Sequence, residues 1–257
     1  MSDSRRPSSV VKQRSMIKLT NLTKVYGNLT AVKSIDLEVK AGEIFGFLGP
    51  NGAGKTTTIK MMAGLLQPTG GSVAIGGFDV QKEPLQAKAI TGFIPDRPYL
   101  YEKLTAGEFM RFVAELYTMP TADGRIDELL GLFGLTDWAG ELVENFSHGM
   151  KQRLVMASSL LHRPKVLVVD EPMVGLDPRG ARLVKDLFKD LASQGVTIFM
   201  STHTLEIVEA MCTRVAIINK GEIIAGGSVE ELGRLARMEN SHLEPIFLKL
   251  TGGDETI

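Results

Sequence analysis

The chain has almost no cysteine: Cys212 is the single one among 257 residues. A lone cysteine cannot form an intrachain disulfide, and such sparse use fits a protein that works in a reducing compartment. Cys212 follows Leu205, Val208 and Met211 at helical spacing. This spacing predicts a buried thiol with a structural role rather than a redox role, because no neighbour in sequence would lower its pKa.

Long apolar runs are absent as well. No stretch approaches the ~18 consecutive apolar residues of a membrane-spanning helix, so we predict no membrane span. Residues 1–15, "MSDSRRPSSVVKQRS", carry charges but no apolar segment, and therefore do not resemble a secretory signal. We interpret them as a disordered, solvated tail; contact of its basic residues with acidic lipid or RNA is the alternative.

The sequence also lacks an excess of charge of either sign. Its 29 Lys and Arg residues face 30 Asp and Glu residues, which gives a formal net charge of -1. A dedicated nucleic-acid-binding protein is usually basic, so this balance argues against that class. With 44% hydrophobic and 23% charged residues, the composition is that of an ordinary globular protein. The length allows one large or two small domains with a substantial core.

The sequence does contain a regular pattern of apolar strands and amphipathic helices. Apolar alternation predicts strands at 17–29 and 35–39 and a further short strand at 71–77. Between them, the apolar run 43–49 predicts a buried strand that ends in glycine and leads into a helix at 56–66.

The pattern becomes mainly helical between residues 85 and 164. Thr105 and Glu108 form a capping box at the start of one of these helices. An apolar, partly aromatic stripe follows the cap at helical spacing, and we expect it to lie in the core. Its members are Phe109, Phe112, Val113, Leu116 and Tyr117.

Strands and helices alternate again after Pro164. The strand "KVLVVDE" is apolar until it ends in acid, which is typical of parallel strands buried on both faces. An amphipathic helix at 181–193, a buried strand at 196–203 and a strand pair around Lys220-Gly221 complete the pattern. The predicted fold is therefore an α/β core interrupted by a helical insertion.

The segment "GPNGAGKTT" fits the phosphate-binding pattern G-x-x-x-x-G-K-[ST], with a strand before it and a helix after it. Glycines let successive backbone N–H groups point at phosphate oxygens. Lys55 would bridge the β- and γ-phosphates, and the hydroxyl of Thr56 would bind Mg²⁺. The predicted ATP-binding residues here are Gly49, Pro50, Asn51, Gly52, Ala53, Gly54, Lys55, Thr56 and Thr57.

Two acids and a histidine lie at the ends of the predicted buried strands. Asp170 and Glu171 are adjacent, so they should point to opposite sides. We predict that Asp170 holds Mg²⁺ and that Glu171 polarises the attacking water as general base. His203 follows the next strand at the same edge of the sheet, where α/β folds bind ligands. We interpret it as a catalytic residue that senses the γ-phosphate.

Residues 146–153, "FSHGMKQR", begin another helix, with Ser147 as its N-cap. The first turns carry Lys151 and Arg153 and no acid, which opposes the helix dipole. Free backbone N–H groups together with added positive charge indicate an anion site.

The ordered motifs "GPNGAGKTT", "FSHGMKQR", "VLVVDEP", "VGLDP" and "STH" closely resemble the nucleotide-binding subunit of ABC transporters. The resemblance spans about residues 17–250. It implies a P-loop NTPase core with an N-terminal antiparallel β-subdomain and an inserted α-helical subdomain. It also implies that Tyr26 stacks on adenine and that Asp177 lies in the D-loop at the dimer interface.

The resemblance implies an ATPase domain at 16–250 after a tail at 1–15. The α/β core would comprise 16–84 and 165–235, the helical lobe with the signature motif would comprise 85–164, and a C-terminal extension would comprise 236–257. "FSHGMKQR" takes the place of the family's signature motif L-S-G-G-Q. In the family, two subunits stack head to tail, so Ser147 and Gly149 would bind the γ-phosphate of the partner's ATP.

One position departs from the family more sharply than the rest. The glutamine of the family's Q-loop should fall in "GFIPDRPYLYEKLT", where this chain has Asp96. An aspartate can still ligate Mg²⁺ through oxygen, although it adds a negative charge that Arg97 would offset. The alternative is a turn aspartate after Pro95.

The implied partners are an integral membrane permease and a second copy of the chain or a homologous ATPase subunit, with no nucleic acid. The protein would act as an ATPase with Mg²⁺-ATP, cytoplasmic and peripheral on the inner face of the cell membrane. Permease contact is expected around residues 96–104, and the resemblance favours an exporter. A soluble ABC ATPase acting on ribosomes or nucleic acid is the alternative. A third class, a catalytically silent interaction subunit, is disfavoured because the chain keeps the expected catalytic residues Lys55, Asp170, Glu171 and His203.

Overall fold

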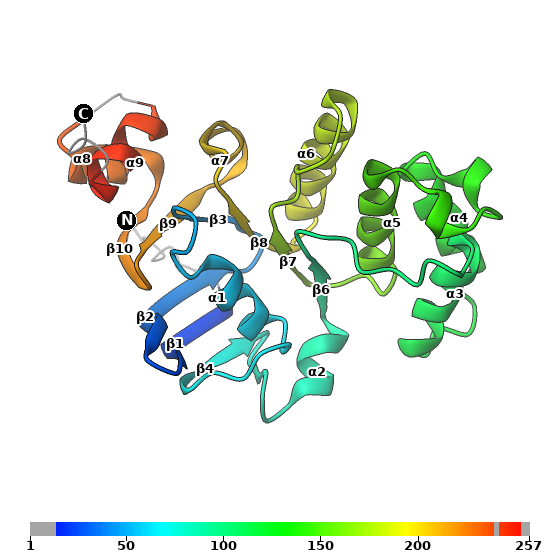
Figure 1. The fold of residues 1–257 in the computed structure, drawn as a ribbon, viewed down its shortest axis with the longest axis horizontal. Coiled ribbons are helices and arrows are strands. Elements are labelled where there is room, and N and C mark those ends of the chain that lie inside the picture. Colours follow the sequence, from blue (N-terminus) through cyan, green and yellow to red (C-terminus); the bar gives the residue numbers. More distant parts are fainter. Residues whose placement is uncertain (1–13, 239–241, 253–257) are drawn as a thin grey trace, which may run out of the picture.

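The computed structural model describes residues 14–238 and 242–252, and within them the strands form two sheets (Figure 1). Most of the expected tail at 1–15 lies outside the described residues, while Ser15 already belongs to the first strand. The four-stranded antiparallel sheet has the order β2-β1-β4-β5. Its strands are β1 (Ser15–Tyr26), β2 (Leu29–Lys40), β4 (Gly70–Ile75) and β5 (Phe78–Asp79).

The second sheet has six strands in the order β10-β9-β3-β8-β7-β6. All neighbours in it pair in parallel except β9 and β10, which form the hairpin predicted around Lys220-Gly221. Because parallel strands share one direction, their carboxyl ends meet at one edge. The strands are β3 (Ile44–Leu48), β6 (Thr91–Ile94), β7 (Val166–Asp170), β8 (Thr197–Thr202), β9 (Arg214–Asn219) and β10 (Glu222–Gly227).

Helices cover both faces of the parallel sheet. On one face, α1 (Lys55–Met62) packs with Phe45 and Phe47 of β3 and with the antiparallel sheet in a single apolar cluster. On the other face, α6 (Pro178–Ser193) packs through Val184 and Phe188 on the alternate residues of β7 and β8. Because both faces of the sheet are covered, β3, β7 and β8 are buried at every position and mainly apolar.

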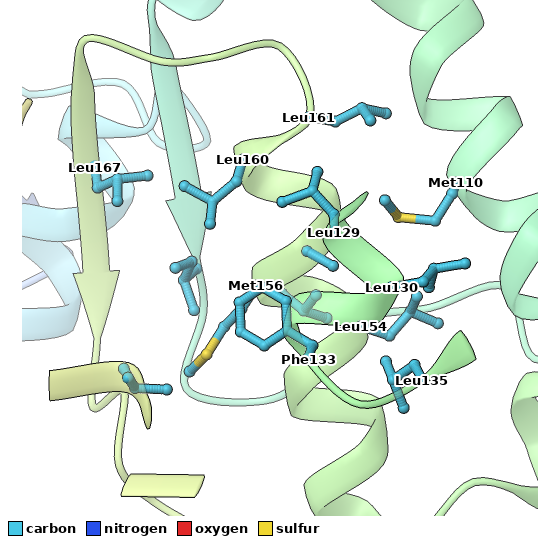
Figure 2. Packing of buried hydrophobic residues seen from close by; sticks show 14 of the residues in the cluster. Met110, Leu129, Leu130, Phe133, Leu135, Leu154, Met156, Leu160, Leu161 and Leu167 are labelled. Atoms are coloured by element: carbon cyan, nitrogen blue, oxygen red, sulfur yellow. The ribbon is translucent and has the colours of Figure 1, made fainter. Parts of the chain in front are cut away.

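The helical lobe lies beside the free edge of β6 (Figure 1). Figure 2 shows Phe133 and Met156 packed between the helices of this lobe, while Leu167 of β7 faces Leu160. Thr105 and Glu108 form the predicted capping box, and Phe109 is buried as predicted, but Leu116 is 67% exposed and does not belong to the core. The helices of the lobe are α3 (Ala106–Leu116), α4 (Asp123–Leu132) and α5 (His148–Leu160), with short 3₁₀ turns at Thr136–Trp138 and Val143–Asn145. The helix α2 (Pro84–Ala89) lies apart from them and packs through Ala87 in the cluster of the antiparallel sheet.

One strand of the parallel sheet lies inside the stretch that the pattern predicts to be mainly helical. β6 pairs with β7 from Thr91 to Ile94, and its sequence "TGFI" is too short to show a period. A side chain at Gly92 would approach the carbonyl oxygen of Ser159 and the side chain of Leu167 to 2.6 Å. The glycine therefore lets α5 and β7 pack directly on this strand.

The C-terminal part packs against the hairpin at the opposite end of the molecule from the helical lobe (Figure 1). It comprises α7 (Leu205–Met211), α8 (Val229–Leu235) and α9 (Leu243–Thr251). Cys212 follows α7, and burial raises the pKa of its thiol to about 12, which agrees with a structural role. Among the described helices, none has the length and apolarity that crossing a membrane requires.

Candidate nucleotide-binding and catalytic site

A cavity of about 460 Å³ lies at the carboxyl edge of the parallel sheet, next to the start of α1. The turn after β3, the turn after β7 and the end of β8 all open into it, as the strand order requires. Sequence segments that are far apart in the chain therefore meet in one place. The cavity is lined by Tyr26, Leu29, Ala31, Asn51, Gly52, Gly54, Lys55, Thr56, Thr57, Asp96, Asp170, Glu171 and His203.

The loop before α1 has a backbone that suits a phosphate group. Gly52 and Gly54 have φ values of 78° and 109°, which L side chains rarely adopt. A side chain at Gly49 would overlap the carbonyl oxygen of Ile218, and one at Gly54 would lie 2.5 Å from that of Ala31. The first turn of α1 carries no acid, so its free N–H groups offer a positive end to an anion.

Lys55 is buried, and its charge lies at the centre of this loop. Its Nζ donates to the carbonyl oxygens of Gly49 at 2.6 Å and Pro50 at 3.2 Å. Burial lowers the pKa of the ammonium group, while the carboxylates of Glu171 and Asp170 raise it. An anion placed at the start of α1 would favour the charged form further, because it would add opposite charge.

Asp170 ends β7 and is 2% exposed. Its Oδ1 accepts a hydrogen bond from Oγ of Ser201, its register partner on β8. Burial raises the pKa of the Asp170 carboxyl, hydrogen bonds from Ser201 and Thr56 lower it, and the charges of Asp96 and Glu171 raise it. The carboxylate is thus held by two hydroxyl groups and faces two other acids.

The residues around Asp170 fit Mg²⁺. The hydroxyl of Thr56 and the carboxylates of Asp170 and Asp96 are hard oxygen donors, which this ion prefers, and the excess of negative charge among them is what a cation would neutralise. In residues 14–238 and 242–252, no three His, Cys, Asp or Glu side chains gather as a metal cluster.

Glu171 and His203, which the sequence places at the ends of neighbouring strands, are in contact. Nδ1 of His203 lies 2.8 Å from Oε1 of Glu171. Glu171 has a φ of 50°, an uncommon left-handed conformation for a residue with a side chain, and its N–H donates to the carbonyl oxygen of Ser201 at 3.1 Å. The turn therefore holds Glu171 at the cavity that Asp170 also lines.

Sequence reasoning did not assign Ser201 a role, yet this residue organises both acids. Its hydroxyl holds Asp170, and its carbonyl group holds the backbone of Glu171. A polar residue at the end of the wholly buried strand β8 was the available clue, since buried hydroxyls need a partner. Tyr26 lies at the rim of the same cavity, 46% exposed, with Nζ of Lys24 5.2 Å from its ring centroid.

Ser147 and Gly149 lie outside this cavity. They line a second cavity of about 750 Å³ together with Asp177, and the two cavities share no lining residue. Ser147 is the N-cap of α5, as predicted, and its Oγ accepts from the N–H of Met150 at 3.3 Å. Asp177 caps α6 in the same way, through the N–H of Gly180 at 2.9 Å.

The predicted use of positive charge for an anion is wrong for Lys151 and stays a prediction for Arg153. Nζ of Lys151 pairs with Oε1 of Glu102 at 2.5 Å. The guanidinium of Arg153 donates to the carbonyl oxygens of Phe133 and Gly149. The charge of Lys151 is thus paired within the helical lobe, whereas Arg153 lines the second cavity together with Ser147 and Gly149, so its charge is available to an anion there.

Asp96 follows β6 and reaches the first cavity, together with Thr56 and Asp170. In the described part of the chain no ion pair joins Arg97 to Asp96, so such a pair does not fix this loop, and the offset of the Asp96 charge by Arg97 stays a prediction. Instead, the loop is tied to α5, where Nε2 of the buried Gln152 donates to the carbonyl oxygen of Pro95 at 3.5 Å.

Known proteins are similar to this chain in sequence and in fold. The model of the ABC transporter family matches residues 32–174. The linearmycin resistance ATP-binding protein LnrL of Bacillus subtilis is 41% identical over 219 residues, 84% of this chain and 70% of that protein. The bacitracin transport ATP-binding protein BcrA of Bacillus licheniformis is 42% identical over 211 residues, 82% of this chain and 69% of that protein.

Solved structures give the same result. An ATP-binding subunit of an ABC transporter superposes with a TM-score of 0.88 at 30% identity, covering 92% of this chain and all of that one. A dimeric ATP-binding cassette in a post-hydrolysis state, bound to ADP and Pi, superposes with a TM-score of 0.77 at 26% identity, covering 83% of this chain and 99% of that one.

Proposed function

The chain belongs to the ABC transporter family as an ATP-binding ATPase subunit, and we propose that it pairs head to tail with a second ATPase subunit around two Mg²⁺-ATP and drives a separate membrane permease. The observation that carries this proposal is the meeting of Lys55, Asp170, Glu171 and His203 in one cavity, while Ser147 lies in another.

Each residue of the first cavity has a chemical task in ATP hydrolysis. The N–H groups at the start of α1 and the ammonium of Lys55 bind the phosphates. Glu171 takes a proton from the attacking water, and His203, 2.8 Å from it, fixes its carboxylate and contacts the γ-phosphate. Mg²⁺, held by Thr56 and Asp170, would supply positive charge that stabilises the leaving phosphate.

The second cavity explains why two subunits are needed. Ser147 and Gly149 share no cavity with the Lys55 of their own chain, so they serve a nucleotide held by another subunit. A second copy in head-to-tail orientation satisfies both chains at once, as a two-fold arrangement does. The similar cassette bound to ADP and Pi is a dimer, which supports this arrangement here.

The permease would dock on an apolar surface between the lobes. A cavity of about 240 Å³ opens there between α1, α2, α3 and α5. Large exposed apolar side chains lie on α2, on α3 and on the loops after α1 and β6, with Tyr99 77% exposed. Such a patch marks an interaction site on a protein surface. Its members are Leu65, Leu85, Tyr99, Tyr101 and Leu116.

We infer that the subunit lies on the inner face of the cell membrane, beside its permease. The names of LnrL and BcrA refer to linearmycin resistance and bacitracin transport. By that analogy, the permease served by this chain is an exporter.

The test is to isolate the full chain from its host membranes in mild detergent. We expect an integral membrane protein to co-purify, and ATP turnover to require Mg²⁺. Tyr99→Ser should release the permease while keeping basal ATPase activity, because Tyr99 lies outside the nucleotide cavity. Leu235→Ser on α8 is the matched control, since Leu235 is also exposed but lies at the other end of the molecule. Co-sedimentation with ribosomes instead of membranes would contradict the proposal.

A further inference from the structure

We propose that His148 is a positioning residue that fixes the loop between Glu171 and Asp177 against the signature helix α5. This inference rests on the proposed function, because it assigns Ser147 and Gly149 to a partner's ATP. His148 stands where the family's signature motif has a glycine, so a contact made by its ring is one that the usual residue cannot make.

The contact joins His148 to Gly175. A methyl group built on Gly175 would overlap Cδ2 of the His148 ring and would lie 2.5 Å from its Nε2. The ring therefore occupies the space that a side chain at position 175 would fill. Gly149 approaches the same loop, because a methyl group there would lie 3.2 Å from the carbonyl oxygen of Gly175. Two successive residues of α5 thus pack on one residue of the loop.

The loop that His148 contacts is short and begins and ends at functional positions. It starts at Glu171, whose N–H is held by β8, and it ends at Asp177, which caps α6. Internal turn bonds join Val174 to Glu171 at 3.2 Å and Leu176 to Met173 at 3.3 Å. Because hydrogen bonds hold both ends and both turns of this loop, the loop has little freedom to absorb a displacement at Gly175.

His148 also lies between the two residues proposed to contact the partner's nucleotide. When Ser147 and Gly149 bind that γ-phosphate, the start of α5 is fixed, and the ring passes this constraint to Gly175. The loop then holds Glu171 at the chain's own ATP and Asp177 at the interface. His148 in this way makes the geometry of one ATP site depend on occupation of the other.

The experiment uses the full chain and compares His148→Gly with His148→Asn. Asparagine keeps an atom near the position of Cδ2, whereas glycine removes the contact. We expect His148→Gly to lower kcat about 2- to 30-fold, the range by which residues in such links change coupling. ATP affinity of the monomer should stay unchanged, because the P-loop is untouched. His148→Asn should keep most of the turnover. Equal losses in both variants, or a loss of ATP affinity in His148→Gly, would overturn the proposal.

A double-mutant cycle that combines His148→Gly with Gly175→Ala tests the contact through stability, without a measurement of ATP turnover. In the wild-type background, the added methyl group collides with His148 and also carries backbone strain, since Gly175 has a φ of 79°. In the His148→Gly background only the strain remains, so Gly175→Ala should lower the midpoint of denaturant unfolding less. Equal destabilisation in both backgrounds would show that the ring does not pack on Gly175. If the wild-type chain hydrolyses no ATP, the proposed function fails, while this cycle still decides the contact.

Discussion

Replacing Ser201 with alanine tests how the buried carboxylate of Asp170 is held ready for Mg²⁺. The substitution removes the hydroxyl that donates to Oδ1 of Asp170 and leaves the backbone bond to Glu171 in place. Partners that hydrogen-bond a metal-ligating carboxylate contribute about 10- to 100-fold to metal affinity. We therefore expect Ser201→Ala to raise the Mg²⁺ concentration for half-maximal ATPase activity by about 10- to 100-fold.

The loss of Mg²⁺ affinity in Ser201→Ala should also depend on pH, and the contacts of Asp170 predict the direction of this dependence. Burial raises the pKa of the Asp170 carboxyl, and the Ser201 hydrogen bond lowers it. Without that bond the pKa rises further, so a larger fraction of the carboxyl is protonated at any mildly acidic pH. Metal binding needs the ionised form. The Mg²⁺ requirement of Ser201→Ala should therefore increase more steeply than that of the wild type as pH falls.

The assay is ATPase activity against free Mg²⁺ at saturating ATP, at one alkaline and one mildly acidic pH. Ser159→Ala is a matched control, since Ser159 is also buried and its hydroxyl donates to a helix carbonyl away from the nucleotide cavity. Ser159→Ala should leave the Mg²⁺ dependence unchanged. An unchanged Mg²⁺ dependence in Ser201→Ala would refute the role of this hydroxyl.

The other substitutions probe the remaining roles one at a time. Glu171→Gln should lower kcat about 10²- to 10⁴-fold by removing the general base and should accumulate as an ATP-bound dimer in size-exclusion chromatography; near-normal turnover would exclude it as the base. Lys55→Ala should abolish tight ATP binding in a direct titration, and unchanged affinity would contradict the phosphate assignment. Ser147→Arg should keep ATP binding by the monomer but block dimerisation and turnover. In a mixture with Lys55→Ala, the heterodimer has one ATP site in which an intact P-loop faces an intact Ser147. A heterodimer without any activity would argue against catalysis in trans, unless both sites must hydrolyse ATP together.

Local sequence motifs were enough to predict the P-loop, the acids after β7 and the cap at Ser147, because each depends on a few neighbouring residues. The strand β6 could not be predicted, because its four residues are defined by pairing with β7 and by the room that Gly92 leaves for α5. The charge of Lys151 was misjudged for a related reason. Lys151 has its partner at Glu102, 49 positions away, and no local pattern indicates such a pair.

The role of Ser201 was equally hidden in the sequence. A serine in the apolar strand β8 becomes informative once the register places it opposite Asp170. The sequence therefore supplied the chemical groups of the site. Sheet register and helix packing, which are set by the whole fold, supplied the residues that orient those groups.

The departure at Asp96 makes a prediction that differs in kind from the one for Ser201. Asp96 reaches the cavity beside Thr56 and Asp170. The ABC transporter family has the neutral amide of its Q-loop glutamine at this position. One charge about 4 Å from a cation is worth on the order of 4 kcal/mol at an effective dielectric near 20. Asp96 is partly exposed, so solvent and salt reduce this value. We expect Asp96→Asn to raise the Mg²⁺ requirement about tenfold, or 1.4 kcal/mol, with ATP binding largely kept.

The pH dependence then separates the two substitutions. The negative charge of Asp96 raises the pKa of Asp170, so removing it lowers that pKa. In Asp96→Asn, the loss of Mg²⁺ affinity should be smallest at mildly acidic pH, where Asp170 gains most in ionisation; in Ser201→Ala it should be largest there. Asp137→Asn, the same change at an exposed residue of the helical lobe, should alter neither quantity. An Mg²⁺ dependence in Asp96→Asn equal to that of wild type would make Asp96 a turn residue, since a carboxylate near the ion cannot be neutralised without weakening its hold.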